Sequence, residues 1–223
     1  MALCEVSFEI FEGEIFGVIG PNGSGKTTLF NVITGFLKAN SGKVTFMGKD
    51  ITGFPPHKLC RQGVARIFQL VKPFHQLTTF KNVMVGRAYG KDPASNIRKA
   101  KEEVVEILNF VGLGNKSEVL ASQLTMAERK RLELARALAV HPQLLLLDEL
   151  MAGLNSAETE IAMELVKKIR SSGITVIMVE HIMKAVLGIS DRVIVLNAGE
   201  KIAEGSPKEV VKNQLVIEAY LGK

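Results

Sequence analysis

A glycine-rich segment carries the strongest chemical signal in the sequence. It reads Gly20-Pro21-Asn22-Gly23-Ser24-Gly25-Lys26-Thr27, satisfies the pattern G-x-x-x-x-G-K-[ST] and directly follows the apolar run 15–19. In this setting glycines let the backbone turn its N–H groups inward around an anion, and a helix that begins at Lys26 adds its positive end. Lys26 can reach the β- and γ-phosphates of a nucleotide, and the Thr27 hydroxyl can ligate a bridging magnesium ion. The alternative, a turn that only caps a helix, leaves the complete pattern unexplained. We therefore predict a nucleotide site that comprises Asn22, Gly23, Ser24, Gly25, Lys26, Thr27 and Thr28.

Two acidic residues follow the apolar run 144–147, namely Asp148 and Glu149. Asp148, at the carboxyl end of a parallel strand, is expected to hold magnesium through its water shell. Glu149, one residue further, can orient and polarise an attacking water. Alone, an acid at a strand end can be simply solvated. Together with the phosphate-binding segment, the pair predicts hydrolysis of the terminal phosphate.

The elements that must position these residues alternate between strand-like and helix-like patterns. This alternation predicts an α/β fold on a mainly parallel sheet. The run 144–147 is apolar on both faces, as expected of a central strand, and 201–204 is expected to pair back on 193–196 through a tight turn. Strands are predicted at 6–10, 15–19, 43–47, 64–68, 144–147, 175–179, 193–196 and 201–204.

Between Gln69 and about Ala135 the strand signal disappears. The segment 93–111 places Ile97, Ala100, Val104 and Leu108 on one helical face. One more crossover helix of the sheet is the less favoured interpretation, because more than one helical segment occurs there without an intervening strand. We predict an α/β core at 1–70 and 135–223, a helical subdomain at 71–134, and two short helices at 207–222.

Composition excludes several classes of protein. With 47% hydrophobic and 23% charged residues, the chain is expected to be soluble and to form a hydrophobic core. Its longest apolar runs are far shorter than the roughly 20 residues of a membrane span, and the acidic amino terminus does not favour export. A net charge of +5 with no Trp and two Tyr does not favour nucleic acid as a partner, and Arg129-Lys130-Arg131 is interpreted as a solvated helix face. Isolated Cys4 and Cys60 fit a reducing compartment.

These residues resemble the nucleotide-binding subunit of ABC transporters over nearly the whole chain. Gln69 and His181 each close a strand at the spacing of that family's Q-loop and switch histidine. Residues 151–155 resemble its D-loop, and Leu124-Thr125-Met126-Ala127-Glu128 stands where its signature motif belongs. More narrowly, the closing segment 203–222 is similar to the ATPases of branched-chain amino-acid importers.

The resemblance implies a P-loop NTPase (RecA-like) core with a mainly parallel sheet, an antiparallel β-subdomain and an inserted helical subdomain. It implies ATP and Mg²⁺ as cofactors and an energy-coupling ATPase of an importer, at the cytoplasmic face of the cell membrane through integral-membrane permease subunits. It also implies a homodimer, or a heterodimer with a related ATPase subunit, that sandwiches two nucleotides. The implied catalytic residues are Glu149, His181, Gln69 and Lys26; the metal ligands are Thr27, Gln69 and Asp148; the contacts made in trans are Thr125, Met126, Ala127 and Glu128.

The chain departs from the family's pattern in several ways. Met126 and Ala127 replace the two glycines of the signature motif, although Thr125 and Glu128 still predict a capping box at the start of a helix. Leu150 replaces the usual Pro after the acidic pair, which is expected to loosen the backbone behind Glu149. The family's adenine-stacking aromatic lies on a strand that precedes residue 1, so base stacking is expected to be weaker.

Two other functions remain open from the sequence. A nucleotide-binding regulatory module with weak or no hydrolysis would account for Met126 and Ala127. A GTPase or small-molecule kinase would share the phosphate-binding segment, but it would leave Gln69 and His181 unexplained.

Overall fold

A six-stranded sheet runs through the centre of the chain in the order β4-β5-β6-β1-β7-β8. The computed structural model describes residues 2–70 and 72–221. Residues 1, 71, 222 and 223, which belong to predicted segments, lie outside the described part. β8 pairs antiparallel with β7, whereas the neighbouring pairs among the other strands are parallel. The strands are β1 (Ile15–Ile19), β4 (Val64–Ile67), β5 (Leu144–Asp148), β6 (Thr175–Val179), β7 (Arg192–Asn197) and β8 (Glu200–Gly205). The predicted mainly parallel α/β sheet is thereby confirmed.

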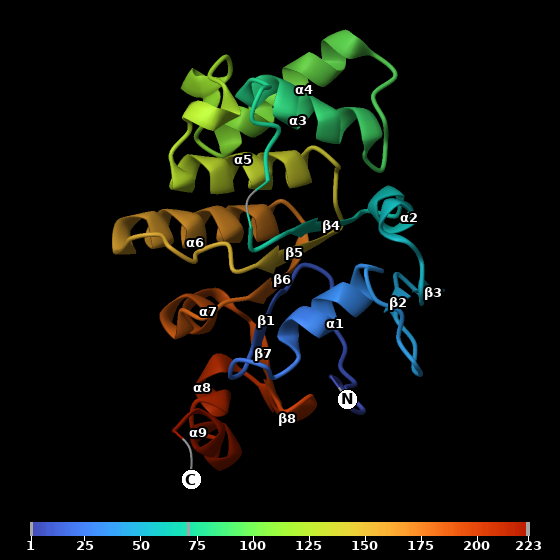
Figure 1. Cartoon of the computed structure of the whole chain (residues 1–223), viewed down its shortest axis with the longest axis vertical. Coiled ribbons are helices and arrows are strands. Elements are labelled where there is room, and N and C mark those ends of the chain that lie inside the picture. The colour runs from blue at the N-terminus through green and yellow to red at the C-terminus, as the bar shows by residue number, and fades with distance from the viewer. Residues whose placement is uncertain (1, 71, 222–223) are drawn as a thin grey trace.

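Helices cover both faces of this sheet, which explains why its inner strands are apolar on both sides. Phe16 and Val18 of β1 pack with Phe30 of the helix that follows, on the side of α1 (Lys26–Ile33) and α2 (Pro56–Arg61). Ile15 and Ile19, which point the other way, belong to a second cluster. This second face is covered by α6 (Ser156–Ser171), α7 (Met183–Ile189) and α8 (Pro207–Val210), opposite α1 in Figure 1.

A group of helices lies beyond the β4 edge of the sheet, at the top of Figure 1. It comprises α3 (Thr79–Tyr89), α4 (Ile97–Phe110) and α5 (Met126–Leu138), with short 3₁₀ turns at Gly114–Lys116 and Ala121–Gln123. Ala100, Val104 and Leu108 are the buried face of α4, as its periodicity predicts. The predicted boundary after residue 134 falls within α5, which continues to Leu138 and packs against β4.

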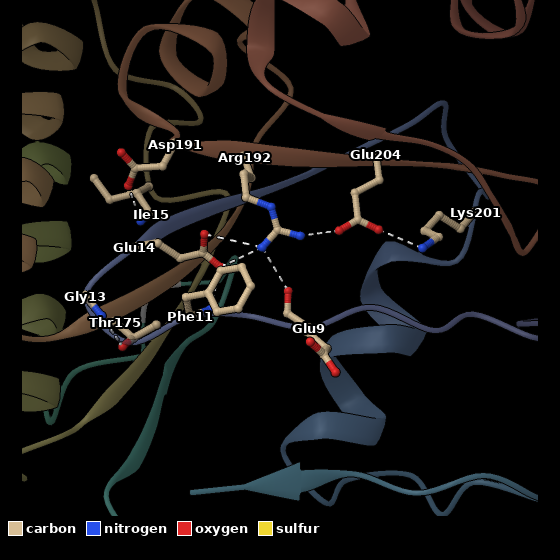
Figure 2. Close-up of polar contacts among 10 residues, drawn as sticks. All are labelled: Glu9, Phe11, Gly13, Glu14, Ile15, Thr175, Asp191, Arg192, Lys201 and Glu204. Atoms are coloured by element: carbon tan, nitrogen blue, oxygen red, sulfur yellow. Dashed lines mark hydrogen bonds and ion pairs between the residues drawn. The ribbon is translucent and has the colours of Figure 1, made fainter.

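The segment 6–10 does not form the predicted strand. Its alternation correctly marks which side chains face the core, since Phe8 stacks on Phe16 with ring centroids 5.4 Å apart. Two of its carbonyls accept hydrogen bonds from side chains instead of from a neighbouring strand: Arg192 Nη1 donates to Glu9 O at 3.1 Å and Lys201 Nζ to Ser7 O at 2.6 Å. In Figure 2 the Arg192 guanidinium lies between the Glu9 carbonyl and the carboxylates of Glu14 and Glu204. The prediction was wrong because alternation reports burial and not the presence of a pairing strand.

Two hairpins complete the antiparallel structure. The predicted strand 43–47 is reduced to β2 (Thr45–Phe46), which pairs with the unpredicted β3 (Lys49–Asp50). Met47 and Gly48 join them with φ values of 50° and 74°, and Ala198 and Gly199 join β7 to β8 with 47° and 86°. Positive φ at both central residues is the backbone of a tight hairpin turn.

The carboxyl-terminal part folds into α8 and α9 (Gln214–Leu221), which confirms the two predicted helices. Among the described residues, no helix combines the length and the hydropathy needed to cross a membrane.

Candidate active site

The glycine-rich segment forms the predicted loop between β1 and α1. Gly20, Gly23 and Gly25 have φ values of 152°, 79° and 104°. At Gly20 a Cβ would lie 2.1 Å from the Leu196 carbonyl oxygen, so only glycine fits that close approach. α1 begins at Lys26 without a side-chain cap, whereas Thr78, Asn96 and other side chains cap helices elsewhere. The N–H groups of its first turn are therefore available to an anion.

Lys26 turns back into this loop. Its side chain is buried, and Nζ donates to the carbonyls of Gly20 at 2.7 Å and Pro21 at 2.9 Å. Burial lowers the pKa of Lys26, while the carboxylates of Glu149 and Asp148 act to raise it. The ammonium thus lies in the loop among carbonyl oxygens whose hydrogen bonds phosphate oxygens can replace. Thr27 is exposed beside it and Thr28 half-buried.

The ends of three neighbouring strands bring Gln69, Glu149 and His181 together. These residues follow β4, β5 and β6, which are parallel and adjacent, so their carboxyl ends meet at one edge of the sheet. Gln69 Nε2 donates to Glu149 Oε2 at 2.6 Å, and His181 Nε2 lies 2.6 Å from Glu149 Oε1. The Glu149 side chain is 12% exposed and that of His181 is 47% exposed. An amide and an imidazole therefore hold both oxygens of a largely buried carboxylate.

Glu149 also has a strained backbone, with a φ of 53°. A left-handed conformation costs a non-glycine residue about 1–2 kcal/mol, so the surrounding bonds must hold it. The Glu149 N–H donates to Val179 O at 2.8 Å, and its carbonyl accepts from the Ala152 N–H at 3.2 Å. Strain of this kind, maintained by neighbouring contacts, is typical of functional positions.

Asp148 is held by an arginine that the sequence analysis did not identify. Arg66 Nη2 donates to Asp148 Oδ2 at 2.6 Å, and the two side chains are 5% and 6% exposed. Arg66 Nη1 also donates to Asn31 Oδ1 at 2.7 Å and Thr34 Oγ1 at 3.1 Å, next to the carboxyl end of α1. Arg66 therefore ties the predicted metal-side carboxylate to the helix that follows the phosphate-binding loop. A charged residue in the otherwise apolar run 64–68 was the available sequence signal.

The signature segment forms the predicted capping box. The Thr125 hydroxyl accepts from the Glu128 N–H, and the Glu128 carboxylate accepts from the Thr125 N–H at 3.0 Å. Glu128 also pairs with Lys116, and this hydrogen bond is the main reason why the pKa of Glu128 is lowered. Met126 and Ala127 are the first residues of α5, and neither has a positive φ. In Figure 1 α5 and α1 lie apart, with strands of the sheet between them.

The interpretation of Arg129-Lys130-Arg131 as a solvated face was wrong for Lys130, which is 5% exposed. Its ammonium donates to the carbonyls of Glu149 at 3.2 Å and Leu150 at 2.7 Å. Residue spacing alone did not show that this face of α5 packs on the loop after β5. Glu180 was also missed: it is 3% exposed, its Oε1 accepts from the Met151 N–H at 2.7 Å, and burial raises its pKa to about 7.

The predicted donors have the chemistry that a magnesium nucleotide requires. The Thr27 hydroxyl, the Gln69 amide oxygen and the Asp148 carboxylate are hard oxygen ligands of the kind that Mg²⁺ takes together with phosphates. Glu149 is a carboxylate held in place by Gln69 and His181, as a group that orients water must be. The arrangement can bind a phosphate chain and activate water against it.

Comparison with known proteins gives a consistent result. The family model described as "ABC transporter" matches residues 3–152, and the one described as "Branched-chain amino acid ATP-binding cassette transporter" matches residues 200–223. The high-affinity branched-chain amino acid transport ATP-binding protein LivG of Salmonella typhimurium is 39% identical, over 100% of this chain and 92% of the relative. The corresponding protein BraF of Pseudomonas aeruginosa is 38% identical with the same coverage.

Solved structures agree with these relatives. An ATP-binding cassette of an ABC transporter in its ADP conformation has a TM-score of 0.89 and 34% identity, over 100% of this chain and 93% of its own. A dimeric ATP-binding cassette in a post-hydrolysis state, bound to ADP and Pi, has a TM-score of 0.82 and 29% identity, over 92% of this chain and 90% of its own.

Proposed function

The chain belongs to the ABC transporter ATP-binding family, and from this premise we propose that it couples ATP hydrolysis to the import of branched-chain or related amino acids. The chain is an ABC ATPase. The amino-acid substrate is inferred from the names of LivG and BraF and from the family match at residues 200–223. Those names describe transport proteins, which favours transport over a regulatory module.

One observation supports the catalytic assignment most directly: Gln69 and His181 hold the two oxygens of Glu149. In the proposed mechanism, main-chain N–H groups of the loop and of the first turn of α1 bind the phosphates, and Lys26 exchanges its carbonyl partners for phosphate oxygens. Glu149 takes the proton of the attacking water, Gln69 orients the water, and His181 contacts the γ-phosphate. Bound Mg²⁺ would neutralise the phosphate charge and would be held by Thr27, Gln69 and, through water, Asp148.

A second copy of the ATPase, or a related subunit, completes the site in this proposal. The segment Thr125-Met126-Ala127-Glu128 at the amino end of α5 lies apart from α1 in the same chain (Figure 1), which supports a contact with a nucleotide bound by another copy. A helix amino terminus is a suitable partner for a γ-phosphate. The helical group α3–α5, predicted as a subdomain at 71–134, would contact permease subunits at the inner face of the cell membrane.

The test is the variant Glu149→Gln. We expect the ATP turnover number to fall by about 10²-fold or more, because a general base contributes that much, and an ATP-dependent dimer to persist in sedimentation velocity. Glu164→Gln is the matched control, since Glu164 is an exposed residue of α6 that accepts a hydrogen bond from Lys167, and this variant should turn over as the wild type does. Wild-type turnover in Glu149→Gln would remove Glu149 from the mechanism. If no ATP-dependent dimer forms, the proposed dimer that encloses two nucleotides would be contradicted.

A further inference from the structure

Lys130 connects the helix of the signature segment to the loop that carries Glu149. It lies in α5, five residues after the capping residue Thr125, yet its side chain is directed away from solvent. Its ammonium donates to two successive carbonyls, those of Glu149 at 3.2 Å and Leu150 at 2.7 Å. One side chain therefore fixes the backbone immediately after the proposed general base.

These carbonyls belong to a backbone that needs fixing. Glu149 has a left-handed φ of 53°, a conformation that persists only where neighbouring bonds determine it. Peptide N–H groups supply part of the constraint, since Glu149 N donates to Val179 O and Met151 N donates to the Glu180 carboxylate. Both of these bonds restrain N–H groups. The Glu149 carbonyl also accepts from the Ala152 N–H of the same segment, and Lys130 adds bonds to the carbonyls of both Glu149 and Leu150 from another element.

The charge environment explains how an ammonium can be retained in this position. Burial lowers the pKa of Lys130, and the carboxylates of Glu180, Glu149 and Glu133 counteract this effect. Hydrogen bonds to two carbonyl oxygens satisfy two of the three donors of the buried ammonium, which reduces the cost of burying it. A methionine of similar length would keep the packing of the aliphatic chain but would make neither bond.

We propose that Lys130 is a positioning residue for ATP hydrolysis, which fixes the Glu149 carboxylate relative to the amino end of α5. This inference rests on the proposed function, in which Glu149 activates water and the amino end of α5 contacts the nucleotide held by the partner subunit. Because α5 is one continuous helix from Met126 to Leu138, docking of its amino end on that nucleotide also sets the position of Lys130. The partner's nucleotide and the base of this subunit are thereby linked through one helix and one side chain.

The experiment compares Lys130→Met, Lys130→Arg and the matched control Arg131→Met in the full chain. Arg131 is the next residue of α5 and also donates to a backbone carbonyl, that of Gly112 at 3.3 Å, in a loop that does not contain Glu149. Turnover number and KM for Mg-ATP are measured, together with ATP-dependent dimerisation. We expect Lys130→Met to lower the turnover number about 10-fold to 100-fold with KM changed less than about threefold, because a group that acts only in the transition state changes turnover rather than ground-state binding. Lys130→Arg should remain within about fivefold of the wild type, and Arg131→Met within about twofold.

A purely structural role would give a different pattern. Loss of folding would reduce the fraction of active enzyme and dimer formation without the recovery expected in Lys130→Arg, whose guanidinium can donate to both carbonyls. In the Glu149→Gln background, Lys130→Met should cause no further loss of residual hydrolysis, because the group that it positions is already absent.

Several results would overturn the inference. These are wild-type turnover in Lys130→Met, a Lys130→Arg variant as slow as Lys130→Met, or a full additional loss in the Glu149→Gln background. If Lys130→Met does not fold, the question is decided by the turnover number of Lys130→Arg and by the residual hydrolysis of the double variant Lys130→Arg/Glu149→Gln. Wild-type turnover in Glu149→Gln itself would instead contradict the proposed role of Glu149.

Discussion

Removal of Arg66 should destabilise the chain strongly, because it leaves the Asp148 carboxylate buried without its partner. The two side chains are 5% and 6% exposed and their atoms lie 2.6 Å apart. Removing one member of a buried ion pair costs about 3–5 kcal/mol. Arg66 also donates to Asn31 and Thr34 and lies over the Phe68 ring at 4.7 Å. Arg66→Met keeps an aliphatic chain but loses all of these polar contacts, so we expect a loss of at least about 3 kcal/mol.

A double-mutant cycle separates the ion pair from the other contacts. In the double variant Arg66→Met/Asp148→Asn no unpaired charge remains. Its loss in free energy of unfolding should therefore be smaller than the sum of the two single losses by about 2 kcal/mol or more. Urea unfolding, followed by circular dichroism, gives each free energy. The control is Arg98→Met, which removes the pair of Arg98 with Glu102, whose side chains are 90% and 62% exposed, and should cost about 0.5 kcal/mol or less.

Two results would contradict this prediction: an Arg66→Met variant whose free energy of unfolding falls by less than about 1 kcal/mol, or losses from the Arg66 and Asp148 substitutions that are additive in the double variant. Either result would mean that Asp148 does not depend on Arg66 for charge compensation. The carboxylate would then have to be solvated in the folded chain, contrary to its burial.

Two further predictions concern the buried carboxylate of Glu180 and the cluster around Arg192. Burial raises the pKa of Glu180 from its ordinary value of 4.5 to about 7, so the folded chain binds this proton more tightly than the unfolded chain does. The resulting contribution to the free energy of unfolding is full below about pH 4.5 and is lost as the pH rises through 7. The control is Glu180→Gln, whose side chain can still accept from the Met151 N–H. Urea unfolding should show the free energy of unfolding of the wild type falling by roughly 2–3 kcal/mol relative to this variant between pH 5 and pH 8, at about 1.4 kcal/mol per pKa unit. A difference that stays constant with pH would contradict the raised pKa. Arg192→Met breaks the contacts with Glu9 O and Glu14 (Figure 2), so the free energy of unfolding should fall by about 1–3 kcal/mol. Limited proteolysis should also cut within residues 5–11 faster than in the wild type, and unchanged cleavage would show that Arg192 does not hold this segment.

The parts of the site that follow from local patterns could be predicted from the sequence. An apolar run marked β1 and β5, and residues that follow parallel strands share one edge of the sheet. This rule, with the resemblance to ABC ATPases, was sufficient to nominate Gln69, Glu149 and His181, which the structure brings together. Their catalytic roles stay predictions until variants are measured.

The remaining features depend on which distant elements meet, and no local pattern records that. The segment 6–10 has the alternation of a strand, but a strand also needs a neighbour, and here Arg192 and Lys201 take that place. Lys130 is flanked by cations and resembles a surface residue until α5 is packed on the loop after β5. Arg66 likewise acquires its meaning only when β4 lies beside β5.

The sequence leaves open whether Met126 and Ala127, which replace the two glycines of the signature segment, disturb the backbone there, and the structure answers this question. Glycine would be required if this segment adopted a positive φ, but Met126 and Ala127 are both helical. Both sides of the capping box are formed, so the substitutions do not prevent α5 from starting at Met126. What they change is the surface, since the Met126 side chain is 58% exposed. An effect of these residues on hydrolysis is therefore expected at the proposed contact of α5 with a second subunit, and not from strain within this chain.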